Sequence, residues 1–190
     1  MQRVLIVDDD EDILKALRRL FSLTPCTAGE QTFRLAVDVF VSPQLALEKA
    51  RQTAYALVIS DYRMPTMNGE QFLKAFRQIQ PEVPRLILSG YADLNGLIEA
   101  INEAGISRFI AKPWNDYELV ASVGQVLALH QLTQENQRLA DQARLAQGTI
   151  SAEDFERKRL EAVEPGITKV HWGPDGSVLL DPSLLDASEG

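Results

Sequence analysis

The side chains best suited to chemistry stand directly after short apolar runs of the sequence. Asp8, Asp9 and Asp10 follow the first run, and Asp61, Ser89 and Lys112 end three later ones. Each has an ordinary interpretation alone, because acidic residues cap helices and serines and lysines are common in turns. If the runs are parallel strands, however, their carboxyl ends meet at one edge of a sheet, where ligands bind.

The combination of these side chains favours phosphoryl chemistry. Carboxylates from neighbouring strands repel one another, and a divalent cation relieves that repulsion. The ligands are oxygens, and the chain has one cysteine and two histidines, so a hard ion such as Mg²⁺ fits better than zinc. Lys112 adds a fixed positive charge and Ser89 a hydroxyl donor. Together with the metal, these groups predict transfer of a phosphoryl group to an aspartate.

The elements that must position these residues alternate between two hydrophobic patterns. Near-continuous apolar runs of four to six residues are typical of buried parallel strands, and apolar residues at helical spacing lie between them. Five such alternations predict a doubly wound α/β sheet with helices on both faces. We expect the strands at 4–7, 37–41, 56–60, 85–89 and 108–111. The stretch 22–34 is interpreted as a long loop, with extra helical turns as an option.

The fifth helix continues past the expected end of the sheet domain. Residues 130–146 contain no proline or glycine, and apolar residues advance in steps of three and four with Asn136 among them. This spacing fits a parallel dimeric coiled coil in which the asparagine sets the register. A helix packed back on its own domain is the alternative. The row comprises Leu129, Leu132, Asn136, Leu139, Ala143, Ala146 and Ile150.

Three segments follow from these patterns: a domain at 1–128, a helical extension and coiled-coil candidate at 129–147, and a small tail at 148–190. Ser151 is the expected N-cap of a short helix in the tail, and a β-hairpin is expected at 167–180. The tail holds nine acidic and four basic residues, and the whole chain has a net charge of −8. This acidity argues against nucleic-acid binding, and the absence of a long apolar run argues against a membrane span. With no signal peptide apparent, a cytoplasmic location is expected.

Four motifs make the sequence similar to the receiver domain of bacterial two-component response regulators. They are VLIVDDD at 4–10, SDYRMPTMNG at 60–69, LSGYAD at 88–93 and FIAKPW at 109–114. Their order and spacing resemble the family over residues 1 to about 130. The details resemble receivers joined to HD-GYP proteins, and 145–160 faintly resembles a short C-terminal oligomerisation motif. The resemblance implies a flavodoxin-like, five-stranded sheet in the order 2-1-3-4-5.

The resemblance also implies a role for each site residue. Asp61 is the expected phosphorylation site, and Lys112 pairs with the phosphoryl group. Mg²⁺ is the expected cofactor, held by Asp61, by Asp9 directly, by Asp8 partly through water, and by the backbone carbonyl of Arg63. Ser89 is the expected switch hydroxyl. Phe109 is either an aromatic switch or a plain core residue.

The implied function is signalling, in which the chain catalyses only its own phosphorylation and dephosphorylation. The expected partners are a sensor histidine kinase or a histidine phosphotransfer protein, an unknown protein effector, and a second copy of the chain through the C-terminal helix. One hypothesis is a switch that changes oligomerisation or partner binding. The alternative is a phosphorelay intermediate, or phosphate sink, that passes phosphoryl groups between histidine proteins.

Overall fold

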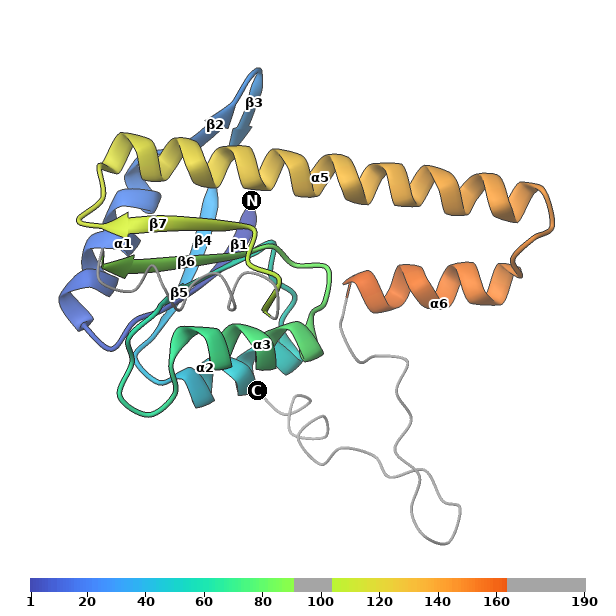
Figure 1. The fold of residues 1–190 in the computed structure, drawn as a ribbon. Coiled ribbons are helices and arrows are strands. Elements are labelled where there is room, and N and C mark those ends of the chain that lie inside the picture. The colour runs from blue at the N-terminus through green and yellow to red at the C-terminus, as the bar shows by residue number, and fades with distance from the viewer. Residues whose placement is uncertain (91–103, 164–190) are drawn as a thin grey trace, which may run out of the picture.

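A five-stranded parallel sheet forms the centre of the molecule in the computed structural model, which describes residues 1–90 and 104–163 (Figure 1). The strand order is β4-β1-β5-β6-β7. Without the separate β2–β3 pair, this is the predicted order 2-1-3-4-5. The strands are β1 (Gln2–Val7), β2 (Cys26–Ala28), β3 (Gln31–Phe33), β4 (Leu35–Phe40), β5 (Leu57–Asp61), β6 (Arg85–Gly90) and β7 (Arg108–Lys112).

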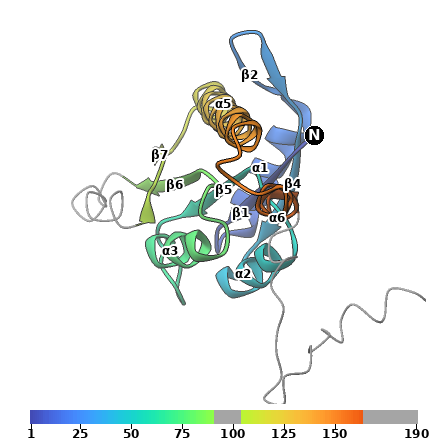
Figure 2. The ribbon, with the colours of Figure 1, turned by 90° about the vertical axis from the view of Figure 1, so that its right-hand side faces the viewer.

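Helices cover both faces of this sheet (Figures 1 and 2). The covering helices are α1 (Glu11–Leu23), α2 (Pro43–Gln52), α3 (Gly69–Ile79) and α5 (Asp116–Ala146), and α6 (Ala152–Val163) lies beside α5 (Figure 1). Alternate residues of β1 enter two different cores: Val4 and Ile6 pack with α1 and α5, whereas Leu5 and Val7 pack with α2 and α3. This two-sided burial explains the near-continuous apolar runs and confirms the doubly wound α/β prediction.

The stretch from 22 to 34 differs from the prediction of a loop or helical turns. It contains the end of α1 and an antiparallel hairpin, β2–β3, that turns at Gly29 with a φ of 58°. The Cys26 and Phe33 side chains of this hairpin are buried. They belong to the same hydrophobic core as the apolar residues of α5. A Cβ on Gly124 of α5 would lie 2.4 Å from the carbonyl oxygen of Thr27, so only glycine allows this close approach.

Helix α5 is a single helix of 31 residues that continues across the predicted boundary at 128. It ends in a Schellman turn, in which Gly148 has a φ of 69° and the Thr149 N–H donates to the Arg144 carbonyl. Helix α6 then runs beside α5 (Figure 1), and the Ser151 hydroxyl accepts from the Asp154 N–H, as predicted for an N-cap. The hairpin expected at 167–180 lies outside the described residues, and so do residues 91–103, where the alternation predicts a helix between the fourth and fifth strands.

No helix in the described part of the chain is long and apolar enough to cross a membrane.

Candidate phosphoryl-transfer site

Asp8, Asp61 and Lys112 meet at the carboxyl edge of the sheet. Asp8 follows β1, Asp61 ends β5 and Lys112 ends β7. The Lys112 Nζ lies 2.8 Å from Asp8 Oδ2 and also forms an ion pair with Asp61 Oδ1. The two carboxylates are almost completely buried, with Asp8 1% and Asp61 5% exposed. The chain therefore places one cation between two desolvated carboxylates from adjacent strands, β1 and β5.

Backbone donors hold the remaining carboxylate oxygens. The Asp10 N–H donates to Asp8 Oδ1 at 2.9 Å, and the Arg63 N–H donates to Asp61 Oδ2 at 2.7 Å. These bonds fix both side chains against Lys112. The metal-binding role of the Arg63 backbone carbonyl stays a prediction.

The charge balance of this cluster is uneven, because two carboxylates share one ammonium group. Burial raises the pKa of the Asp8 carboxyl, and the negative charge of Asp61 acts in the same direction, against the lowering effect of the Lys112 hydrogen bond. Burial also acts to lower the pKa of Lys112, but hydrogen bonds to Asp61 and Asp8 outweigh it, and the net shift is upward. The cluster therefore keeps the lysine charged and favours an additional positive charge.

The three acidic residues after β1 have three different environments. Asp8 is buried in the cluster, whereas Asp9 is exposed. Asp10 is the N-cap of α1, with its Oδ1 accepting from the Asp12 N–H at 2.8 Å and the Ile13 N–H at 3.3 Å. The ordinary capping interpretation thus applies to Asp10 alone.

The residues present fit Mg²⁺ better than they fit a metal caged entirely by protein. Among residues 1–90 and 104–163, no three His, Cys, Asp or Glu side chains are grouped to hold a metal ion. Mg²⁺, however, is commonly held by one or two carboxylates, with water and phosphate oxygens completing its shell. Asp8 and Asp61 supply that oxygen-only pair next to an excess of negative charge.

Ser89 lies on the strand between Asp61 and Lys112 in the sheet. It is 1% exposed on β6, where it pairs with Ala111 in register, and Asp61 pairs with Leu88. Its hydroxyl lies 3.4 Å from the Gly90 carbonyl oxygen as a donor. The sheet order thus brings all four predicted strand-end positions to consecutive strands at one edge.

Comparison with known proteins identifies the family to which the chain belongs. The model of the response regulator receiver domain matches residues 4–124, which include the whole cluster. The chain belongs to the response regulator receiver domain family.

Relatives of this receiver occur both as parts of larger regulators and as solved domains. The hydrogenase transcriptional regulatory protein HoxA of Bradyrhizobium diazoefficiens is 31% identical over 87% of the chain, which spans 31% of HoxA. The receiver domain of an HD domain-containing protein from Pseudomonas fluorescens is 30% identical, with a TM-score of 0.62 over 70% of this chain and 92% of that one. An uncharacterized protein from Neptuniibacter caesariensis is 39% identical, with a TM-score of 0.63 over 71% and 93% of the two chains.

Two further residues of the receiver lie close to the cluster. Phe109, two strands from Asp61 on β7, is half-buried and packs against the core under α2 and α3. Gly69 was not singled out from the sequence, yet a Cβ there would lie 2.1 Å from the Asp61 carbonyl oxygen. Its N–H also donates to the Tyr62 carbonyl at 2.8 Å. Only glycine therefore lets α3 start against the backbone of Asp61.

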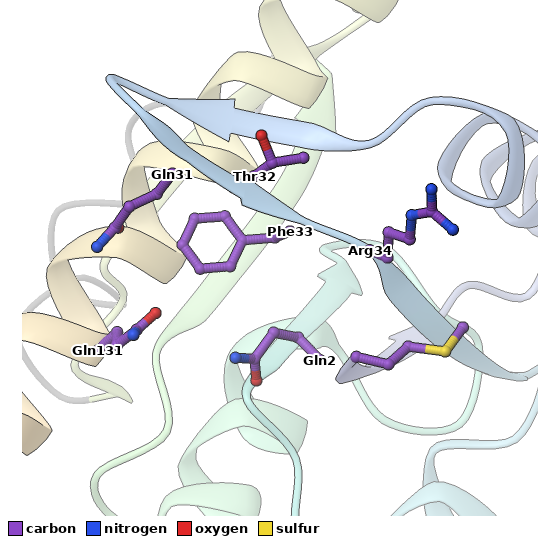
Figure 3. A pocket seen from close by; sticks show the side chains of 7 residues that line it. Gln2, Gln31, Thr32, Phe33, Arg34 and Gln131 are labelled. Carbon is purple, nitrogen blue, oxygen red and sulfur yellow. The ribbon is translucent and has the colours of Figure 1, made fainter.

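The receiver also has a polar hollow at the opposite edge of the sheet, where β1 begins (Figure 3). It measures about 280 Å³ and lies between β3, the first residues of the chain and α5. Figure 3 shows the Phe33 ring and the amides of Gln2, Gln31 and Gln131 around it. The hollow contains no residue of the carboxylate cluster and is separate from the phosphoryl-transfer site.

Proposed function

We propose that the chain is a phospho-accepting switch of a two-component system, in which Asp61 receives a phosphoryl group from a histidine kinase. The observation that carries this proposal is the buried pair of Asp61 and Asp8 on the single ammonium of Lys112. A structural ion pair would need only one carboxylate. The surplus carboxylate makes the site a receptor for positive charge and for the phosphoryl group that accompanies it.

Asp61 acts as the nucleophile in this mechanism. One of its oxygens forms the new bond to phosphorus while the phosphorus–nitrogen bond of a phosphohistidine breaks. The electron pair of that bond stays on the imidazole nitrogen, which then takes a proton from water. Lys112 stabilises the negative charge that develops on the phosphoryl oxygens, and the Arg63 N–H holds the second carboxylate oxygen in place.

Mg²⁺ is part of the proposal as the cofactor. Asp8, Asp61, Asp9 and the carbonyl of Arg63 are the groups that would hold it, of which the first two are buried and face Lys112. The ion would neutralise phosphoryl charge and orient the incoming group. The upward shift of the Asp8 pKa supports the proposal, because a desolvated carboxylate next to another gains from a second cation.

The switch itself is assigned to Ser89 and Phe109. We propose that the Ser89 hydroxyl turns toward the phosphoryl group on Asp61 and that Phe109 moves into the space this leaves. The two residues lie on adjacent strands, β6 and β7, and Phe109 is only half-buried, so its ring has room to move. Hydrolysis of the acyl phosphate by water resets the switch.

The outputs proposed for this switch are a second copy of the chain, bound through the C-terminal helix, and a protein effector. The matched HoxA is a transcriptional regulatory protein of which the chain spans less than a third. We place the output of residues 1–190 in protein–protein contact.

The decisive experiment labels the chain with acetyl phosphate and Mg²⁺. We expect Asp61→Asn to lose all labelling, and chelation of Mg²⁺ to abolish labelling of the wild type. The matched control is Asp10→Asn, because Asp10 is an N-cap outside the cluster and asparagine caps equally well. Equal labelling of Asp61→Asn and wild type would refute the phosphorylation site. Rapid transfer of the label back to a histidine phosphotransfer protein would favour the relay instead.

A further inference from the structure

A groove opens at the edge of the sheet where β1 and β4 begin, beside the end of α1. It measures about 380 Å³, and none of the carboxylate cluster lines it. Two of its lining side chains, Met1 and Leu23, are large and apolar and are 91% and 72% exposed. The rest of the lining is Phe21, Ser22, Pro25, Arg34 and Leu35. Large apolar side chains left open to solvent beside a groove mark a surface where another apolar segment packs.

The β2–β3 hairpin holds a positive charge at this groove. Cys26 pairs with Phe33 in register, so Pro25 before β2 and Arg34 after β3 are held side by side. Figure 3 shows the Arg34 side chain directed away from the Phe33 ring and the polar hollow around it. Arg34 is exposed and makes no ion pair within residues 1–90 and 104–163. Its guanidinium is therefore open to a carboxylate that enters the groove.

The surroundings of the groove are basic, although the chain as a whole is acidic. Residues 13–37 contain four basic residues and one acidic residue, whereas the whole chain has a net charge of −8. Arg18 and Arg19 are exposed on α1, one helical turn before Ser22 and Leu23 of the lining. The Ser22 hydroxyl donates to the Arg18 carbonyl at 2.6 Å, across that turn. The groove thus favours an apolar segment that carries negative charge.

The segment after α6 has this composition. Residues 164–190 contain five acidic residues and one lysine, and the sequence LLD occurs twice, at 179–181 and at 184–186. Each repeat joins two large apolar side chains to one carboxylate, which matches an apolar groove that contains one arginine. The segment lies outside the described residues, and its net charge of −4 is opposite in sign to the net charge of +3 at 13–37.

Helix α6 directs this segment toward the same edge of the sheet. Helix α5 projects past that edge, where its Gln131 lines the polar hollow together with Gln2 of β1. Helix α6 then returns from the far end of α5 toward the sheet (Figure 1). The 16 residues from Val163, where α6 ends, to Leu179 can span about 50 Å when extended. That reach exceeds the length of α5, which is about 46 Å for 31 residues.

We propose that the segment 177–190 docks in the groove between the end of α1 and the β2–β3 hairpin of its own chain. The leucines of one repeat pack against Phe21 and Leu23, and the aspartate of that repeat pairs with Arg34. The lengthened connection between α1 and β4 thereby gains a binding role, because the hairpin forms one wall of the groove. The docking does not depend on phosphorylation of Asp61 and goes beyond the function proposed above.

The test is paramagnetic NMR on the full chain. Ser183→Cys places a cysteine between the two repeats, and a nitroxide attached to it broadens the signals of backbone amides that lie near it. Cys26 is buried, with its pKa raised to about 12, and stays unlabelled. We expect broadening at residues 21–24 and 31–35. Broadening confined to other residues, or no broadening, would overturn the docking.

Two pairs of variants of the labelled chain test the chemistry of the groove. Arg34→Glu should lower the ratio of docked to free segment at least about tenfold, because like charges then meet. Arg51→Glu makes the same change on α2, which packs on the other face of the sheet, and should have no effect. Leu23→Asp should also release the segment, whereas Leu45→Asp, at an exposed leucine of α2, should not. Equal effects within either pair would contradict the assigned groove.

A mixed sample separates docking within one chain from docking on a second copy. Spin-labelled chain is mixed with isotope-labelled chain that has no nitroxide, and the amides of the isotope-labelled chain are observed. We expect these amides to stay sharp at 21–24 and 31–35. Broadening there would show that the segment binds another copy and would overturn docking within the chain. Labelling of Asp61 with acetyl phosphate, measured separately, decides the phospho-acceptor proposal.

Discussion

Substitution of Gly69 by alanine tests whether the start of α3 positions the phosphoryl-accepting aspartate. A Cβ at this position would lie 2.1 Å from the Asp61 carbonyl oxygen and 2.9 Å from the Tyr62 Cα. Both neighbours are backbone atoms, so no side chain can turn away, and the backbone must shift by about 1 Å to reach ordinary contact distances. A displacement of that size is enough to lower the rate of a positioned reaction by about a hundredfold.

The expected loss of stability is modest by comparison. Overpacking a well-packed site costs about 1–3 kcal/mol, and the better helix propensity of alanine returns up to about 1 kcal/mol. A net loss of about 1–2 kcal/mol corresponds to a fall of about 3–6 °C in Tm for a chain of this size. Gly69→Ala should therefore remain folded at 25 °C while its Asp61 labelling rate, measured with acetyl phosphate and Mg²⁺, falls about tenfold to a hundredfold.

Gly124→Ala is the matched control, because its Cβ would meet the Thr27 carbonyl oxygen at 2.4 Å, far along the chain from Asp61. We expect a similar fall in Tm and a wild-type labelling rate. A Gly69→Ala chain that labels at the wild-type rate would refute the positioning role. Equal slowing in both variants would show that lost stability, rather than displacement of Asp61, lowers the rate.

The remaining predictions concern the cluster, the buried thiol and the turn after α5. Lys112→Met should lower the rate of Asp61 labelling by at least about tenfold, because it removes the fixed cation; an unchanged rate would contradict its role. Burial raises the folded-state pKa of Asp8 above 3.8, so the wild type loses stability as pH rises through that raised pKa. Asp8→Asn should consequently have the higher urea midpoint at pH 7, and the difference should shrink toward pH 3; parallel pH profiles would argue against this. Cys26 should react with a thiol reagent only on unfolding, since it is buried and its pKa is raised to about 12; rapid reaction of the native chain would be inconsistent. Gly148→Ala places a side chain at a φ of 69°, which costs about 1–2 kcal/mol, so limited proteolysis between α5 and α6 should be faster than in the wild type.

The sheet and the edge of the sheet that carries the site could be predicted because both depend on short-range patterns. Buried parallel strands require continuous apolar runs, and the polar residue that ends each run necessarily lies at the carboxyl edge. Asp8, Asp61, Ser89 and Lys112 are identified by this rule without knowledge of the strand order. The structure adds that Lys112 bridges the two carboxylates, a contact between residues 104 positions apart.

Such patterns could not predict the β2–β3 hairpin or the close backbone contacts of the two glycines. Strands β2 and β3 have three residues each, too few for a hydrophobic period, and they depend on Cys26 and Phe33 entering the core under α5. Gly69 and Gly124 are needed because a Cβ at either position would collide with a backbone carbonyl oxygen, that of Asp61 or that of Thr27. The spacing of residues along the chain does not reveal such contacts. Likewise, three consecutive aspartates look alike until α1 takes Asp10 as its cap and leaves Asp9 exposed.

The continuity of α5 has a mechanical consequence. At 1.5 Å per residue its 31 residues form a rod about 46 Å long, of which about 28 Å extends past Leu127. The contact of Gly124 with Thr27 lies near the point where the rod leaves the domain and can serve as its fulcrum. A tilt of 5° about that point would carry the far end of α5 through about 3 Å by the same helix geometry, which is comparable to the shifts that separate alternative packings of helices. The long helix thus converts small tilts at the sheet domain into displacements of its far end that are large enough for a partner to detect.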